Sequence, residues 1–98
     1  MMSQDELKRR ILARRPELRA RGVSHMALFG SRARSDARPD SDIDLMIDID
    51  KPGFSLIDLV AIQQDLSEDI GLPVQITMRR SLPERLAKVA KAEAIELF

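Results

Sequence analysis

Residues 28–45 read LFGSRARSDARPDSDIDL, and this stretch decides the fold. It joins an apolar run to a Gly-Ser turn, and after a polar loop it enters a segment in which acidic and apolar residues alternate. The apolar members are Ile43, Leu45, Ile47 and Ile49, and the residues around them are Asp42, Asp44, Met46, Asp48 and Asp50. Strict alternation is typical of a β-strand with one buried face. It predicts that Asp42 and Asp44 project from the same face of a strand.

The turn at Gly30 and Ser31 lies just upstream of this strand. Glycine lets the backbone approach a ligand closely, serine can cap a helical turn, and N–H groups at such a turn attract phosphate. A Gly-Ser pair alone is weak evidence, because turns are rich in both residues. Two carboxylates on one face strengthen it, since Mg²⁺ commonly binds one or two carboxylates together with phosphate oxygens. The combined pattern predicts a metal and phosphate site.

The remaining elements follow from apolar spacing and turn residues. Helices are predicted over 4–15, 55–70 and 82–94, the first capped by Ser3 with Glu6 as its capping-box partner and the second ended by Gly71. Strands are predicted over 23–29, 42–50 and 72–78. Residues 16–22 form a turn or a short second helix, and residues 95–98 either continue the last helix or run extended. The order α-β-turn-β-α-β-α predicts an α/β (α+β) domain with a mixed three-stranded sheet packed by helices.

Composition limits the classes of function. The 98 residues suit one domain spanning 1–98, and 44% hydrophobic with 33% charged residues is typical of a globular chain. The absence of cysteine excludes disulfides, thiol catalysis and zinc-thiolate sites. No apolar run is long enough to span a membrane, and residues 1–10 are too polar for a signal peptide. We therefore expect a cytoplasmic protein with no membrane association.

Charge is segregated along the chain although the net charge is zero. Residues 1–39 carry ten Lys/Arg against four Asp/Glu, residues 40–69 carry one against nine, and residues 70–98 carry five against three. A nucleic-acid binder more often shows an overall basic excess, so we expect no direct nucleic-acid contact. An acidic centre beside arginines suits a divalent metal with phosphate, although charges in such runs often only solvate a surface.

The motif has the form G-S-x(10)-D-x-D, and with its Ser-Asp-Ile-Asp-Leu strand it closely resembles the minimal nucleotidyltransferases of the DNA polymerase β-like superfamily. The resemblance is strongest to the MNT antitoxins that are paired with HEPN toxins. It implies that Gly30 and Ser31 hold a nucleoside triphosphate, with Arg32 as a further nucleotide contact, and that Asp42 and Asp44 bind Mg²⁺. In that family an acceptor hydroxyl attacks the α-phosphorus and pyrophosphate is released.

The sequence departs from the family pattern at two positions. Ser35 stands where a glycine is common, and Gln75 stands where the third strand normally offers a third aspartate. Loss of a general base typically lowers a rate by about 10²–10⁴. Asp48 lies roughly 13 Å along the strand from Asp44, at the rise of an extended chain, and is a poor substitute.

Two functions of different classes follow from this pattern. In the first, the protein is a Mg²⁺-dependent antitoxin enzyme that transfers AMP from ATP to a hydroxyl, a tyrosine, of a HEPN toxin. In the second, it is a catalytically impaired protein of the same fold that neutralises its partner by binding, because Gln75 replaces the third carboxylate. The first helix or the last one could supply the partner surface in a homo- or hetero-oligomer, although burial in the core is the default expectation for the apolar residues near the carboxyl terminus, Leu82, Leu86, Val89 and Ile95.

Two other motifs fail. An EF-hand loop that starts at Asp40 requires glycine at its sixth position and glutamate at its twelfth, but this chain has Leu45 and Lys51 there. A P-loop requires Gly-Lys-Ser/Thr after its first glycine, and none follows Gly30. The remaining candidates for phosphate or partner contacts are Arg34, Arg38, Arg79 and Arg80. We expect His25 to be structural. We expect the core to include Met26, Met46 and Met78.

Overall fold

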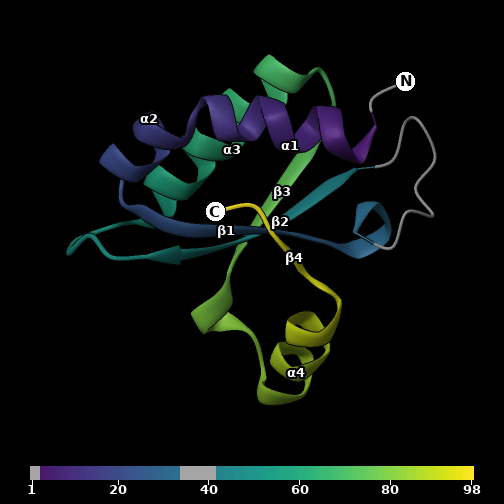
Figure 1. Cartoon of the computed structure of the whole chain (residues 1–98). Coiled ribbons are helices and arrows are strands. Elements are labelled where there is room, and N and C mark those ends of the chain that lie inside the picture. Colours follow the sequence, from purple (N-terminus) through teal and green to yellow (C-terminus); the bar gives the residue numbers. More distant parts are fainter. Residues whose placement is uncertain (1–2, 34–41) are drawn as a thin grey trace.

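The computed structural model describes residues 3–33 and 42–98. A mixed four-stranded sheet organises the chain, with strand order β3-β2-β1-β4 (Figure 1). Its strands are β1 (Val23–Phe29), β2 (Ile43–Ile49), β3 (Val74–Met78) and β4 (Ile95–Glu96). The strand β2 pairs antiparallel with β1 and parallel with β3, and β4 pairs antiparallel with β1. The α/β (α+β) class is confirmed.

The number of strands predicted from the sequence, three, was wrong. Residues Ile95 and Glu96 pair with Leu28 and Ala27 and add a fourth strand at the free edge of β1. A two-residue strand is too short to show a periodic pattern, which is why the sequence left residues 95–98 undecided. The carboxyl-terminal residues continue this contact, because Leu97 N donates to the Met26 carbonyl at 2.8 Å.

The helices cover the two faces of the sheet unequally. On one face lie α1 (Gln4–Ala13), α2 (Arg15–Ala20) and α3 (Leu56–Ile70), and on the other, among the α-helices of the described residues, lies only α4 (Glu84–Glu93) (Figure 1). The main core lies on the three-helix face and includes Ile43, Leu45 and Ile47 of β2. The α4 face has a small cluster of Ala27, Met46 and Ala90. One face therefore supplies most of the buried apolar surface, and the other is thinly covered.

Local signals account for the helix boundaries. Ser3 accepts a hydrogen bond from Glu6 N at 3.1 Å, so the predicted cap is confirmed, while the Glu6 carboxylate pairs with Arg9 and Arg10. The first helix ends two residues earlier than predicted, and the chain resumes as the short helix α2 with a proline in its first turn. Within the described ranges, no helix is long and apolar enough to cross a bilayer.

The helix α3 offers a matched test of where the core lies. Ile62 is 1% exposed and Ile57 on the same helix is 81% exposed. We expect Ile62→Ala to lower the free energy of unfolding by about 2–5 kcal/mol. Ile57→Ala should change it by no more than about 0.5 kcal/mol, because no core contact is lost. Urea unfolding followed by circular dichroism measures both, and equal losses would contradict the assignment of the buried face.

Candidate active site

The turn after β1 contacts the first acidic residue of β2 directly. Gly30–Arg32 forms a 3₁₀ turn, and Phe29, just before it, pairs in register with Asp44. Gly30 has φ +76°, and a Cβ built on it would lie 2.6 Å from Asp44 Oδ2. A side chain at residue 30 would thus be strained and would displace the carboxylate. The sequence predicted close approach of this glycine to a ligand, and the structure adds a close approach to Asp44.

The two aspartates lie at the amino end of β2. Asp44 is half-buried within the strand and Asp42, directly before the strand, is exposed, whereas Ile43 and Leu45 are buried in the main core. This burial pattern matches the predicted alternation. Both carboxylates therefore belong to the side of the strand away from the main core, and that is the thinly covered α4 side.

Gln75 lies beside Asp44. The parallel pairing of β2 with β3 places Gln75 opposite Asp44 in the register, and the Gln75 side chain is exposed. Neighbouring strands are about 4.8 Å apart, so the two side chains can reach a common ligand. Among the described residues no three His, Cys, Asp or Glu side chains gather into a metal-binding group. The structure thus places the Gln75 amide beside Asp44 across the parallel pairing of β2 and β3.

A pocket of about 230 Å³ opens from Asp44 along the same face of the sheet. It lies between the sheet and the segment that carries α4. Its lining is apolar apart from Asp44 and Thr77, and comprises Phe29, Asp44, Leu45, Met46, Thr77, Leu82, Leu86 and Ala90. Strand alternation puts Thr77 on the same face as Gln75, whereas the contribution of Leu82 and Leu86 has no local sequence signal.

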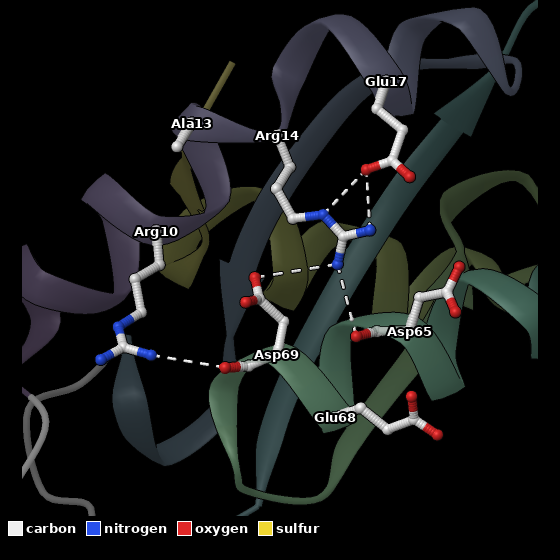
Figure 2. A pocket seen from close by; sticks show the side chains of 7 residues that line it. All are labelled: Arg10, Ala13, Arg14, Glu17, Asp65, Glu68 and Asp69. Atoms are coloured by element: carbon white, nitrogen blue, oxygen red, sulfur yellow. Dashed lines mark hydrogen bonds and ion pairs between the residues drawn. The ribbon is translucent and has the colours of Figure 1, made fainter.

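A larger hollow of about 770 Å³ lies elsewhere, between α1, α2 and α3 (Figure 2). Arg14 bridges its walls: the guanidinium lies 2.7 Å from Glu17 and 3.8 Å from Asp69, and donates to the Asp65 carbonyl at 3.3 Å. Arg10 donates to the Asp69 carbonyl at 3.4 Å. Arg14 compensates part of the acidic charge through Glu17 and Asp69, and none of the lining residues belongs to the Gly30 turn or to β2. The smaller pocket, which contains Asp44, is the better candidate for chemistry.

Arg32 and Arg79, two of the arginines named from the sequence as candidate ligand contacts, lie in different surroundings. Arg32 is buried, with 6% exposure, and its carbonyl accepts a hydrogen bond from Gln4 Nε2 at 2.9 Å, so α1 holds the turn in place. Arg79 donates to Glu96 at 3.0 Å and lies 3.5 Å from Asp48, and the hydrogen bond to Glu96 raises the Arg79 pKa. Arg79 therefore joins β2 and β4 and is not available to phosphate.

Several other predictions have a plain outcome. Met26 and Met46 are buried, and Met78 packs against the main core, as predicted. His25 and Arg80 are exposed. Ser35 and the proposed phosphate contacts Arg34 and Arg38 lie outside the described residues, as does the loop around Pro39.

Comparison with known proteins identifies relatives across nearly the whole chain. A family model described as "Nucleotidyltransferase domain" matches residues 6–97. The protein adenylyltransferase MntA of Thermococcus cleftensis is 32% identical over 96 residues, which cover 97% of this chain and 96% of that protein.

Solved structures share the fold. A structure assigned as a minimal nucleotidyltransferase superposes with a TM-score of 0.83 at 33% identity, over 96% of this chain and 95% of the other. A chain from the tri-AMPylated Shewanella oneidensis HEPN toxin in complex with MNT antitoxin gives a TM-score of 0.71 at 20% identity, over 97% and 71% of the two chains. At that identity the second likeness concerns the fold alone.

The contact between Gly30 and Asp44 can be tested with a second glycine as control. Gly30 and Gly71 both have positive φ, but a Cβ on Gly71 meets nothing within 4 Å. We expect Gly71→Ala to lower the free energy of unfolding by about 1–2 kcal/mol through backbone strain alone. Gly30→Ala should cost more, because the new methyl group also displaces the Asp44 carboxylate.

A double-mutant cycle isolates that steric part. In an Asp44→Ala background, the cost of Gly30→Ala should fall to that of Gly71→Ala. Chemical denaturation measures all the variants. If the cost of Gly30→Ala is the same with and without the Asp44 carboxylate, the contact is not the reason for glycine at residue 30.

Proposed function

Because the chain belongs to the nucleotidyltransferase domain family, we propose that it is an antitoxin enzyme that transfers AMP from ATP to a hydroxyl group of a HEPN-domain toxin. The proposed acceptor is a tyrosine and the proposed metal is Mg²⁺. One domain, residues 1–98, carries the reaction, in the cytoplasm where ATP is available. The observation that carries this proposal is the Gly30 turn packed against Asp44, beside Asp42 at the start of β2.

The donor set fits a hard divalent cation. Asp42 is exposed and Asp44 half-buried, so a metal there would keep several water or phosphate ligands. Mg²⁺ commonly uses one or two protein carboxylates and completes its shell with phosphate oxygens. When bound, it would polarise the α-phosphate and neutralise the charge of the departing pyrophosphate.

The chain itself positions the nucleotide in this proposal. Gly30 and Ser31 bind the triphosphate through the backbone of the 3₁₀ turn, and the buried Arg32 adds positive charge beside it. The hydrogen bond from Gln4 to the Arg32 carbonyl holds the turn against α1. A turn fixed in this way binds phosphate at a smaller entropic cost than a mobile loop.

The names of the relatives support the proposal that the acceptor is a protein. The Thermococcus relative is named a protein adenylyltransferase, and the Shewanella structure contains an AMPylated HEPN toxin with its MNT antitoxin. A folded protein that presents a hydroxyl is therefore the proposed acceptor.

A second function is favoured by the position of Gln75. Because Gln75 lies in register with Asp44, it occupies the place from which a carboxylate would take the proton of the attacking hydroxyl. If Gln75 lowers turnover below a useful rate, the protein would act as an antitoxin by binding its partner, with the nucleotide site retained. The two functions differ in whether AMP becomes covalently attached to the partner.

The decisive experiment uses ATP labelled at the α-phosphate, Mg²⁺ and the HEPN-domain protein that we expect a neighbouring gene to encode. We expect covalent label on the partner, dependent on Mg²⁺ and lost in Asp42→Asn and Asp44→Asn. Asp50→Asn is the matched control, because Asp50 is exposed just past the far end of β2. Stable complex formation without any label would reject transfer and leave the binding function.

Gln75 has its own matched pair of variants. We expect Gln75→Asp to raise transfer by about 10²–10⁴, because a carboxylate beside Asp44 restores a proton acceptor. Gln75→Asn has nearly the shape of the aspartate variant without its charge and should give no increase. Initial rates of pyrophosphate release measure both. An equal rate in the two variants would show that a charge at residue 75 does not limit the reaction.

A further inference from the structure

The pocket beside Asp44 has one polar end and an otherwise apolar body. Asp44 and Thr77 are the only lining residues with polar side chains, while Phe29, Met46 and Leu82 are among the apolar ones. Asp44 belongs at the same time to the proposed metal site, and Phe29 directly precedes the Gly30 turn. A group inside the pocket would thus have its polar tip beside the reacting phosphate.

Pocket size limits what can enter. Its volume of about 230 Å³ lies below the range of about 300–1,000 Å³ that is typical of sites for whole drug-sized ligands. One ring system fits within this volume. Leu86, on the outer wall, is 46% exposed, so the pocket reaches the surface of α4, where another protein can approach.

We propose that this pocket receives the aromatic ring of the acceptor tyrosine, with its hydroxyl directed toward Asp44 and Gln75 and its backbone at the Leu86 rim. This inference rests on the proposed function and names the residues that select the acceptor. Met46 and Ala90 of the small cluster line the pocket under α4, together with Thr77 and Leu82.

A phenol suits this lining better than the adenine base of the nucleotide. Adenine carries polar atoms around its edge, and each one buried without a hydrogen-bond partner is costly. The pocket offers the Thr77 hydroxyl as its one neutral polar side chain. A phenol ring has a single polar group at its tip, which leaves its body to contact the apolar walls.

An acceptor hydroxyl that loses its proton readily suits a site that has an amide, and not a carboxylate, at residue 75. In the transfer, the phenolic oxygen forms a bond to the α-phosphorus, the bond between that phosphorus and the bridging oxygen to the β-phosphorus breaks, and pyrophosphate leaves. The phenolic proton passes to solvent water, because the Gln75 amide cannot accept it. A phenol, with a pKa of about 10, gives up its proton far more readily than the hydroxyl of serine or threonine. A site without a third carboxylate therefore favours a tyrosine acceptor.

Binding can be tested without turnover by using N-acetyltyrosinamide and adenosine as probes. We expect N-acetyltyrosinamide to shift the methyl NMR signals of Thr77, Leu82 and Leu86 saturably, and adenosine to leave them unchanged. Ile57, exposed on α3 across the sheet, is the internal control and should not respond. Shifts from adenosine at these methyls, or no shift from the tyrosine probe, would overturn the proposal. This readout stands even if no AMP transfer is found.

A pair of filling variants tests the same pocket in the reaction. Thr77→Phe places a ring in the pocket from an exposed position of β3, and Val89→Phe adds the same ring to α4 at a residue outside the lining. We expect Thr77→Phe to abolish the NMR shifts of Leu82 and Leu86 and to raise the KM for the HEPN partner by at least about tenfold at an unchanged KM for ATP, the sign of lost acceptor binding. Val89→Phe should retain the NMR shifts. A raised KM for ATP in Thr77→Phe would instead assign the pocket to the nucleotide and overturn the inference.

Discussion

The strand β2 sets the constraint on which the rest of the structure depends. It lies between β1 and β3, and its alternating residues serve two different environments. Ile43, Leu45 and Ile47 enter the main core, while Asp44 and Met46 face α4. A slip of one residue in either pairing would exchange these two sets, burying carboxylates under three helices. The core that stabilises the sheet therefore also fixes the register of the site.

Much of this arrangement was predictable because β2 shows its period over seven residues, Ile43–Ile49. Gln75 was singled out by the family resemblance and not by periodicity, and the structure shows it in register with Asp44. Elements of very few residues, and contacts between residues distant in the sequence, were not predictable. The strand β4 has two residues, and the pocket joins Thr77 to Leu82 and Leu86 through a turn whose path the sequence does not specify.

The segregation of charge along the chain did not distinguish the candidate site from ion pairs between helices. The acidic centre and the basic amino-terminal part suggested a metal and phosphate site, yet several of these charges pair across the opposite face of the sheet. Arg21 lies 2.6 Å from Asp65, and Arg14 lies 3.8 Å from Asp69. Counting charges cannot separate pairs between packed helices from groups at a site, because both place opposite charges close together. The spacing of Asp42 and Asp44 was informative because it states which face the side chains share.

Because the helices cover the two faces of the sheet unequally, most of the stabilising core lies on the face opposite the pocket. The three-helix face contains most of the buried apolar residues, so the fold does not depend strongly on α4, which packs on the sheet through a cluster of only three buried residues. Lining residues that α4 and its preceding turn contribute, such as Leu82 and Leu86, can thus differ in size without unfolding the sheet. The position of Asp44 cannot vary in this way, because Gly30, β1 and β3 all contact its strand. If the pocket receives the acceptor as proposed, the position of Asp44 stays fixed while the walls that meet the partner remain adjustable.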